Sequence, residues 1–143
     1  MAIKSTGLRN YLLDTGSVKS ALALGFIRIF AGAIPTDADA AETGTLLCVI
    51  TDAADGTTGL TLETSAVSGI INKNASVWGS TSGSTGVASY FRFVQAGDTG
   101  ALSSTDKRIQ GTIATAGADF NMTNTTITSG LMNVDYFSIA EPE

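Results

Sequence analysis

The chain has its clearest strand signal at residues 87–95, which read Val-Ala-Ser-Tyr-Phe-Arg-Phe-Val-Gln. Side chains in a strand alternate between two faces. Phe91 and Phe93 therefore point to one face of this strand. Tyr90 and Arg92 point to the opposite face. Two phenylalanines on the same face predict that this face is buried in a hydrophobic core.

The same two-residue period begins at Phe26 and continues to the end of the chain. A continuous apolar run at residues 45–51 predicts a strand buried on both faces. At Tyr136-Phe137 the alternation shifts, which predicts a β-bulge in one final strand. The Gly/Ser/Thr-rich residues 79–86 are expected to connect a hairpin or to form a mobile tip. The remaining expected strands cover residues 26–30, 60–62, 69–73, 75–80, 109–113, 120–122 and 132–140.

Turn residues separate these segments, so the sequence predicts a mainly β fold. About eight short antiparallel strands at this spacing are typical of a jelly-roll-like sandwich or a small barrel. Residues 1–25 differ, because Leu8, Tyr11 and Leu12 recur at helical spacing. We therefore expect a short helical N-terminal segment or arm over residues 1–25, followed by a single β domain over residues 26–143.

The composition argues against most enzyme classes. Charged residues make up 15% of the chain, against about 25% in typical domains. The net charge is −5, and the eight basic residues are spread singly. Without a Lys/Arg run, direct binding to nucleic acid or to an anionic membrane is not expected. The chain has no histidine, the commonest general base and zinc ligand, so we expect no catalytic residues, cofactor or metal.

The single cysteine, Cys48, lies in an apolar run and cannot form an internal disulfide. A buried thiol and a reducing compartment are therefore expected. The most apolar early stretch, residues 21–34, carries Arg28 at its centre and is too short to span a bilayer. No signal-peptide pattern precedes it, so the sequence predicts a protein that is not exported by its own signal.

One motif suggests an enzyme. Two leucines followed by Asp14-Thr15-Gly16-Ser17 resemble the catalytic motif of retroviral-type aspartic proteases, in which two aspartates share one proton. A second Asp-Thr-Gly begins at Asp98. The pattern before Asp14 is helical, however, whereas the protease motif follows a strand. The alternative interpretation is a helix break, with Ser17 capping the next helix.

Two groups of acidic residues are candidate calcium ligands, although neither has the spacing of a calcium loop. They are expected to be solvated loop acids. The acidic groups are Asp37, Asp39 and Glu42, and Asp52 with Asp55.

Trp78 is open to two interpretations, as an interface anchor or as a core residue.

Short segments along nearly the whole chain carry a family resemblance. They are Gly7-Leu8-Arg9-Asn10 with Leu12-Leu13, Ile27-Arg28-Ile29-Phe30-Ala31-Gly32 with Pro35 and Ala38-Asp39-Ala40, Gly44-Thr45-Leu46-Leu47, Trp78 with Tyr90-Phe91-Arg92, Arg108-Ile109-Gln110-Gly111-Thr112-Ile113, Ile127-Thr128-Ser129-Gly130 and Val134-Asp135-Tyr136-Phe137. In these segments the chain resembles the small capsid cement (decoration) proteins of tailed bacteriophages.

The resemblance implies a jelly-roll-like fold, a homo-oligomer (dimer or trimer) and attachment to the outer surface of the shell built by the major capsid protein. It also implies synthesis in the cytoplasm of a bacterial host and a final location on the exterior of the virion capsid. We expect partner contacts at Leu8, Tyr11, Leu12, Trp78 and Tyr90. The alternatives are a phage tail, neck or receptor-binding β-module and, less favoured, a retroviral-type aspartic protease through Asp14-Thr15-Gly16.

Overall fold

The computed structural model describes residues 1–141, and it confirms the mainly β fold with short N-terminal helices. The helices are α1 (Thr6–Asp14) and α2 (Val18–Ala21). The strands are β1 (Ile3–Lys4), β2 (Phe26–Ala31), β3 (Thr45–Asp52), β4 (Ile70–Asn72), β5 (Trp78–Ser80), β6 (Gly86–Val87), β7 (Tyr90–Val94), β8 (Arg108–Ala114), β9 (Phe120–Asn121), β10 (Thr126–Ile127), β11 (Met132–Val134) and β12 (Ser138–Ala140).

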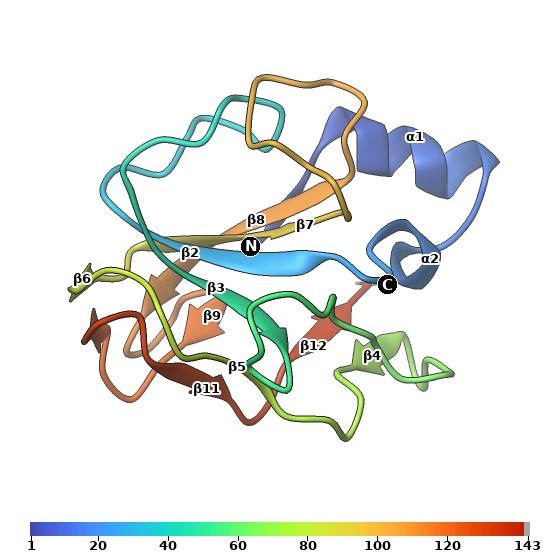
Figure 1. The fold of residues 1–143 in the computed structure, drawn as a ribbon. Coiled ribbons are helices and arrows are strands. Elements are labelled where there is room, and N and C mark those ends of the chain that lie inside the picture. Colours follow the sequence, from blue (N-terminus) through green and yellow to red (C-terminus); the bar gives the residue numbers. More distant parts are fainter. Residues whose placement is uncertain (142–143) are drawn as a thin grey trace.

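The main sheet has eight strands in the order β1-β8-β7-β2-β3-β5-β11, with β9 paired to β8. The pairings along this path are antiparallel, whereas β9 runs parallel to β8. Two small sheets, β10-β6 and β12-β4, complete the fold. Figure 1 shows β5, β11 and β12 beneath β2 and β3, so the main sheet curls over and encloses a core.

Aromatic side chains fill the centre of this core, as the alternation in residues 87–95 predicts. Phe91 and Phe93 are 3% and 0% exposed. The ring of Phe93 meets Trp78 and Phe137 edge-on, with centroids 6.3 and 5.8 Å apart. Cys48 is also buried here, at 2% exposure. Edge-to-face packing of this kind adds to the stability gained from burying the aromatic area.

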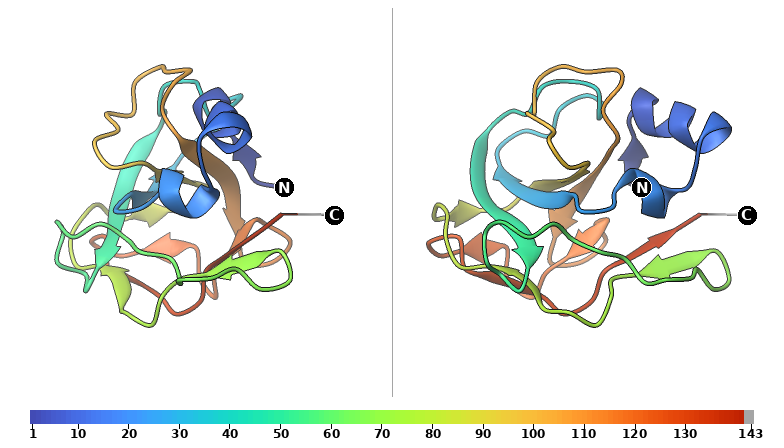
Figure 2. Two further views of the ribbon diagram at one scale, coloured as in Figure 1. Left: turned by 90° about the vertical axis from the view of Figure 1, so that its right-hand side faces the viewer. Right: turned by 45° about the vertical axis from the view of Figure 1, so that its right-hand side comes forward.

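The N-terminal segment is built onto the β domain. β1 pairs with β8, and the hydroxyl of Ser5 accepts a hydrogen bond from the amide of Leu8 to cap α1. Leu8 is fully buried in the common core. Ser17 caps α2 through a capping box, as the alternative interpretation of the Asp-Thr-Gly-Ser motif predicts. Figure 2 shows α1 and α2 packed along one side of the sheet.

Several details differ from the sequence-based expectation. Residues 132–140 form two strands, β11 and β12, in different sheets, so the phase shift at Tyr136-Phe137 marks a break and the predicted bulge was wrong. A register irregularity lies instead between Ile29 and Phe30. In β3, Leu46 is 41% exposed, so that strand is not buried throughout on both faces.

The Gly/Ser/Thr-rich loop is also not the connection of a hairpin, because β5 pairs with β3 and β11 and not with β7. The loop crosses β3, where the amide of Ser84 donates to the carbonyl of Leu47 at 2.7 Å. Gly83 has a φ of +147°, and a Cβ there would collide with the same carbonyl oxygen. Close backbone approach therefore requires glycine at this position.

Candidate functional site: an arginine-anchored loop platform

The face of the main sheet that points away from the core is also buried, because two long loops cover it. The loops are residues 32–44 and residues 95–107, which we call the loop platform. Figure 1 shows them side by side above β2, β7 and β8. The amide of Glu42 donates to the carbonyl of Gly100 at 2.8 Å, so the two loops are also bonded to each other.

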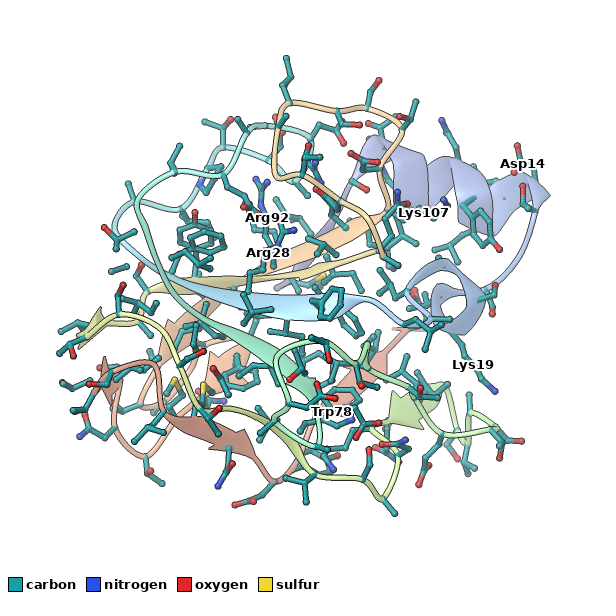
Figure 3. The ribbon with its side chains drawn as sticks, viewed as in Figure 1. Asp14, Lys19, Arg28, Trp78, Arg92 and Lys107 are labelled. Carbon is teal, nitrogen blue, oxygen red and sulfur yellow. The ribbon has the colours of Figure 1, made fainter. Side chains whose placement is uncertain are left out.

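Polar side chains of three neighbouring strands lie in a row beneath the loop platform. The sheet register places Arg28 beside Arg92, and Arg92 beside Gln110. Figure 3 shows Arg28 and Arg92 rising from the sheet into the space under the loops. Arg108 joins them from β8, and both Arg92 and Arg108 are 0% exposed. Charged residues are almost never fully buried unless they are paired, so each of these needs partners.

Arg92 anchors the first loop. Its Nη1 donates to the carbonyl of Ala40 at 2.8 Å, and its Nη2 donates to the carbonyl of Asp37 at 3.1 Å. Its Nε donates to the Gln110 side chain at 2.7 Å. Burial away from water, and then the positive charge of Arg108, lower the pKa of Arg92.

Arg108 anchors the second loop. Its Nε and Nη2 donate to the two carboxylate oxygens of Asp98, at 2.5 and 2.9 Å. The Nη2 atom also lies 3.1 Å from the carboxylate of Asp106 and donates to the carbonyl of Ala101 at 2.8 Å. Burial alone would lower the pKa of Arg108, but the hydrogen bonds and charge of Asp98 raise it above its ordinary value. A bidentate pair of this kind fixes both position and orientation.

Two more side chains join the sheet to the loop platform. Nη1 of Arg28 donates to the Glu42 carboxylate at 2.8 Å, and its Nη2 donates to the carbonyl of Asp98. The hydroxyl of Tyr90 accepts from the amide of Thr43 at 3.1 Å and donates to the carbonyl of the same residue. The Tyr90 ring stacks on Phe30 with centroids 4.7 Å apart.

Every buried side-chain nitrogen and oxygen within residues 1–141 has a hydrogen-bond partner. The cluster under the loop platform is therefore fully satisfied, and a fully satisfied buried polar network rigidifies the structure around it. The outer surface of the platform is exposed and weakly charged. Leu102 is 77% exposed at its surface, among small exposed side chains such as Thr36, Thr99 and Ser104.

The structure does not gather the expected partner-binding residues into one surface. Leu8, Trp78 and Tyr90 are each 0% exposed, so in this fold they support the core or the loop platform and offer no surface to a partner. Trp78 donates through its indole nitrogen to Asn74 at 3.1 Å, in keeping with its interpretation as a core residue. Tyr11 and Leu12 are half-buried and keep partial access to solvent.

The two Asp-Thr-Gly motifs also occupy different environments. Asp14 lies exposed at the C-terminal end of α1, as Figure 3 shows. The carboxylate of Asp98 is buried and bound to Arg108. Asp98 is therefore held under the loops by Arg108, whereas Asp14 is open to solvent.

The acidic loop residues mainly stabilise turns and loops. Oδ1 of Asp37 accepts from the amides of Asp39 and Ala40, and Oδ1 of Asp55 accepts from two following amides. Among residues 1–141, no group of three or more acidic or cysteine side chains is arranged to hold a metal ion. The same part of the chain has no helix long and apolar enough to cross a membrane.

The sequence did contain a signal for the loop platform. Arg28, Arg92 and Gln110 each interrupt an apolar strand at the position that faces away from the core. Three neighbouring strands with this feature indicate a buried polar layer if the outer face is covered.

No known family matches the chain, and no curated protein or solved structure shows significant similarity to it.

Proposed function

We propose that the protein is a non-enzymatic structural component of a tailed bacteriophage that binds the outer surface of the major capsid protein shell and stabilises it. The main support is the loop platform, in which buried arginines hold two irregular loops in one conformation. Loops that are ordered before binding lose little conformational entropy when a partner docks. Such a surface suits a protein whose role is contact.

The platform surface also fits repeated binding to a symmetric shell. Its exposed residues are mostly small and neutral around the apolar Leu102, so it can dock on a partner without a strong charge requirement. A homo-oligomer carrying several platforms would bind neighbouring shell subunits at once, and multivalency would increase the total affinity. Attachment across subunit boundaries would then resist expansion of the shell.

A sedimentation assay tests this proposal. The purified protein is mixed with expanded, DNA-free shells or with isolated coat subunits, and the shells are then pelleted. We expect co-sedimentation with shells and much weaker binding to isolated subunits, because only the shell presents several sites together. Equal binding to both, or to neither, would count against the cement function and favour a tail, neck or receptor-binding role.

A matched pair of variants tests the platform itself. Leu102→Glu places a charge on the exposed surface of the platform, and we expect at least tenfold weaker binding to shells. Leu131→Glu changes another exposed leucine, 60% exposed and outside the loop platform, and should leave binding within twofold. Both variants should keep the unfolding midpoint of the parent protein. A loss of binding in Leu131→Glu alone would move the contact surface away from the platform.

A further inference from the structure

The two layers of strands are open along one side. The gap lies between β1, at the edge of the main sheet, and β12, at the edge of a small sheet, and has a volume of about 490 Å3. We call it the seam groove. Both panels of Figure 2 show the N- and C-terminal strands on this side of the molecule. The walls include Ala2, Lys4, Ser138 and Ala140, and buried core residues Phe91, Ile109 and Phe137 form the floor.

The wall formed by β1 has free backbone groups. The amide of Ser5 donates to the carbonyl of Arg108 at 2.9 Å, which fixes the phase of the β1–β8 pairing. In an antiparallel pair, residues that bond to the neighbour alternate with residues whose N–H and C=O point away. The backbone groups of Lys4, and of Ala2 two positions earlier, therefore point away from β8 toward the seam groove.

The wall formed by β12 has the same property. The amide of Glu141 donates to the carbonyl of Gly69 at 2.9 Å. The carbonyl of Phe137 accepts from the amide of Lys73, which follows β4, at 2.8 Å. The alternation between these two positions leaves the N–H and C=O of Ser138 and Ala140 pointing away from β4. Within residues 1–141, no hydrogen bond uses the backbone groups of these two residues, of Ala2 or of Lys4.

We propose that the seam groove binds an extended segment of the coat protein, which pairs with both walls as an added strand. This inference rests on the proposed function, because it takes the coat protein as the partner. The added strand would satisfy the free backbone groups on both sides and join the main sheet to the β12-β4 sheet. Its alternate side chains would point to Phe91, Ile109 and Phe137, so they should be apolar.

The size and charge of the groove favour a single extended segment over a folded face of a second copy. Each wall offers the outward backbone groups of two residues, whereas a stable autonomous interface buries about 800 Å2 on each partner. Among residues 1–141, the charged groups that line the groove form two pairs near its ends: Lys4 pairs with Glu141 at 2.7 Å, and Asp119 pairs with the N-terminal amine at 3.1 Å. The middle is neutral and apolar, which matches a segment with apolar central residues and polar ends.

Amide hydrogen exchange tests the pairing directly. In the free protein, the amides of Ala2, Lys4, Ser138 and Ala140 should exchange rapidly, because no acceptor within residues 1–141 protects them. In the shell-bound protein, these four amides should be slowed at least tenfold. The amide of Leu102 lies on the loop platform and serves as a control. It reports the protection that shell contact produces outside the seam groove.

A pair of variants tests the groove independently. Ala140→Pro removes an outward N–H that β4 does not use, and its ring projects into the seam groove. Ala140→Val keeps the N–H and serves as the matched control. We expect Ala140→Pro to weaken shell binding at least tenfold and Ala140→Val to stay within twofold, with similar unfolding midpoints.

The outcomes separate the two proposals. Shell binding with unprotected wall amides would overturn the groove proposal and leave the cement function standing. No shell binding at all would overturn both. Protection that grows with protein concentration in the absence of shells would identify a second copy as the occupant and would also overturn the proposal. If Ala140→Pro lowers the unfolding midpoint, the amide exchange data on the parent protein decide whether the seam groove binds the coat protein segment.

Discussion

Replacing Asp98 by asparagine should strongly destabilise the fold, although the side chain keeps its shape. The carboxylate is fully buried and uses both oxygens. Oδ2 accepts from Nε of Arg108 at 2.5 Å, while Oδ1 accepts from Nη2 at 2.9 Å and from the amide of Gly100 at 2.7 Å. An asparagine side chain would turn its NH2 group toward one guanidinium N–H and leave the buried charge of Arg108 only partly compensated.

The expected loss of stability follows from the burial of the Asp98–Arg108 ion pair. Breaking a buried ion pair by neutralising one partner costs about 3–5 kcal/mol. For a chain of this length, each kcal/mol lowers the unfolding midpoint by about 2–4 °C, so Asp98→Asn should lower it by roughly 10 °C. That loss would be a large part of a total stability of about 5–15 kcal/mol.

Asp106 provides a matched control with the same arginine partner. Its carboxylate is 25% exposed and lies 3.1 Å from Nη2 of Arg108. Solvent screens such a pair, so Asp106→Asn should lose less than about 1 kcal/mol. Urea unfolding at pH 7, followed by tryptophan fluorescence of Trp78, measures both variants. If Asp98→Asn is no less stable than Asp106→Asn, the Asp98–Arg108 pair does not anchor the second loop as we describe.

Three further predictions concern the core, the thiol and the alternative enzyme hypothesis. Phe93→Ala should lower the free energy of unfolding by about 3–5 kcal/mol, measured by urea denaturation; an unchanged midpoint would contradict the core assignment. Burial raises the pKa of Cys48 to about 11, above the unfolded value of about 8.5. The contribution of the buried neutral thiol to the free energy of unfolding is therefore complete below about pH 8.5 and is lost as the pH rises toward 11. Iodoacetamide at pH 8 should therefore label Cys48 only after unfolding, and rapid labelling of the native protein would refute its burial. Asp14→Asn should change the free energy of unfolding by less than about 0.5 kcal/mol; peptide cleavage at acid pH that this substitution abolished would support the protease alternative.

Local periodicity was enough to predict the main strands and the helical N-terminal segment. Phe91 and Phe93 face the core as the alternation in β7 indicates, and Ser17 caps a helix as its position suggests. These features depend on neighbours in the sequence, which the pattern contains. The division of residues 132–140 into two strands depends on which sheet edge each half meets, and no local pattern encodes that choice.

The loop platform was missed for a related physical reason. Tyr90 and Arg92 alternate with core residues, a pattern that usually indicates a solvent-facing side of a strand. Their burial depends on loops that come from residues 32–44 and 95–107 and have no periodicity of their own. The polar side chains in apolar strands were visible, but their covering was not, so Tyr90 was predicted as a contact residue when it anchors a loop.

The pairing of β1 with β8 also determines when the molecule can finish folding. Ser5 and Arg108 are 103 positions apart, yet the amide of Arg108 donates to the hydroxyl of Ser5 at 2.9 Å. Because synthesis proceeds from the N-terminus, β1 must wait for the 103 residues up to Arg108 to be made before its partner strand can form. Contacts between residues so far apart in the sequence slow folding, and domains dominated by such contacts fold in milliseconds to seconds. Until β1 docks, the edge of β8 that it covers stays unpaired, and unpaired strand edges of this kind make folding intermediates prone to aggregate.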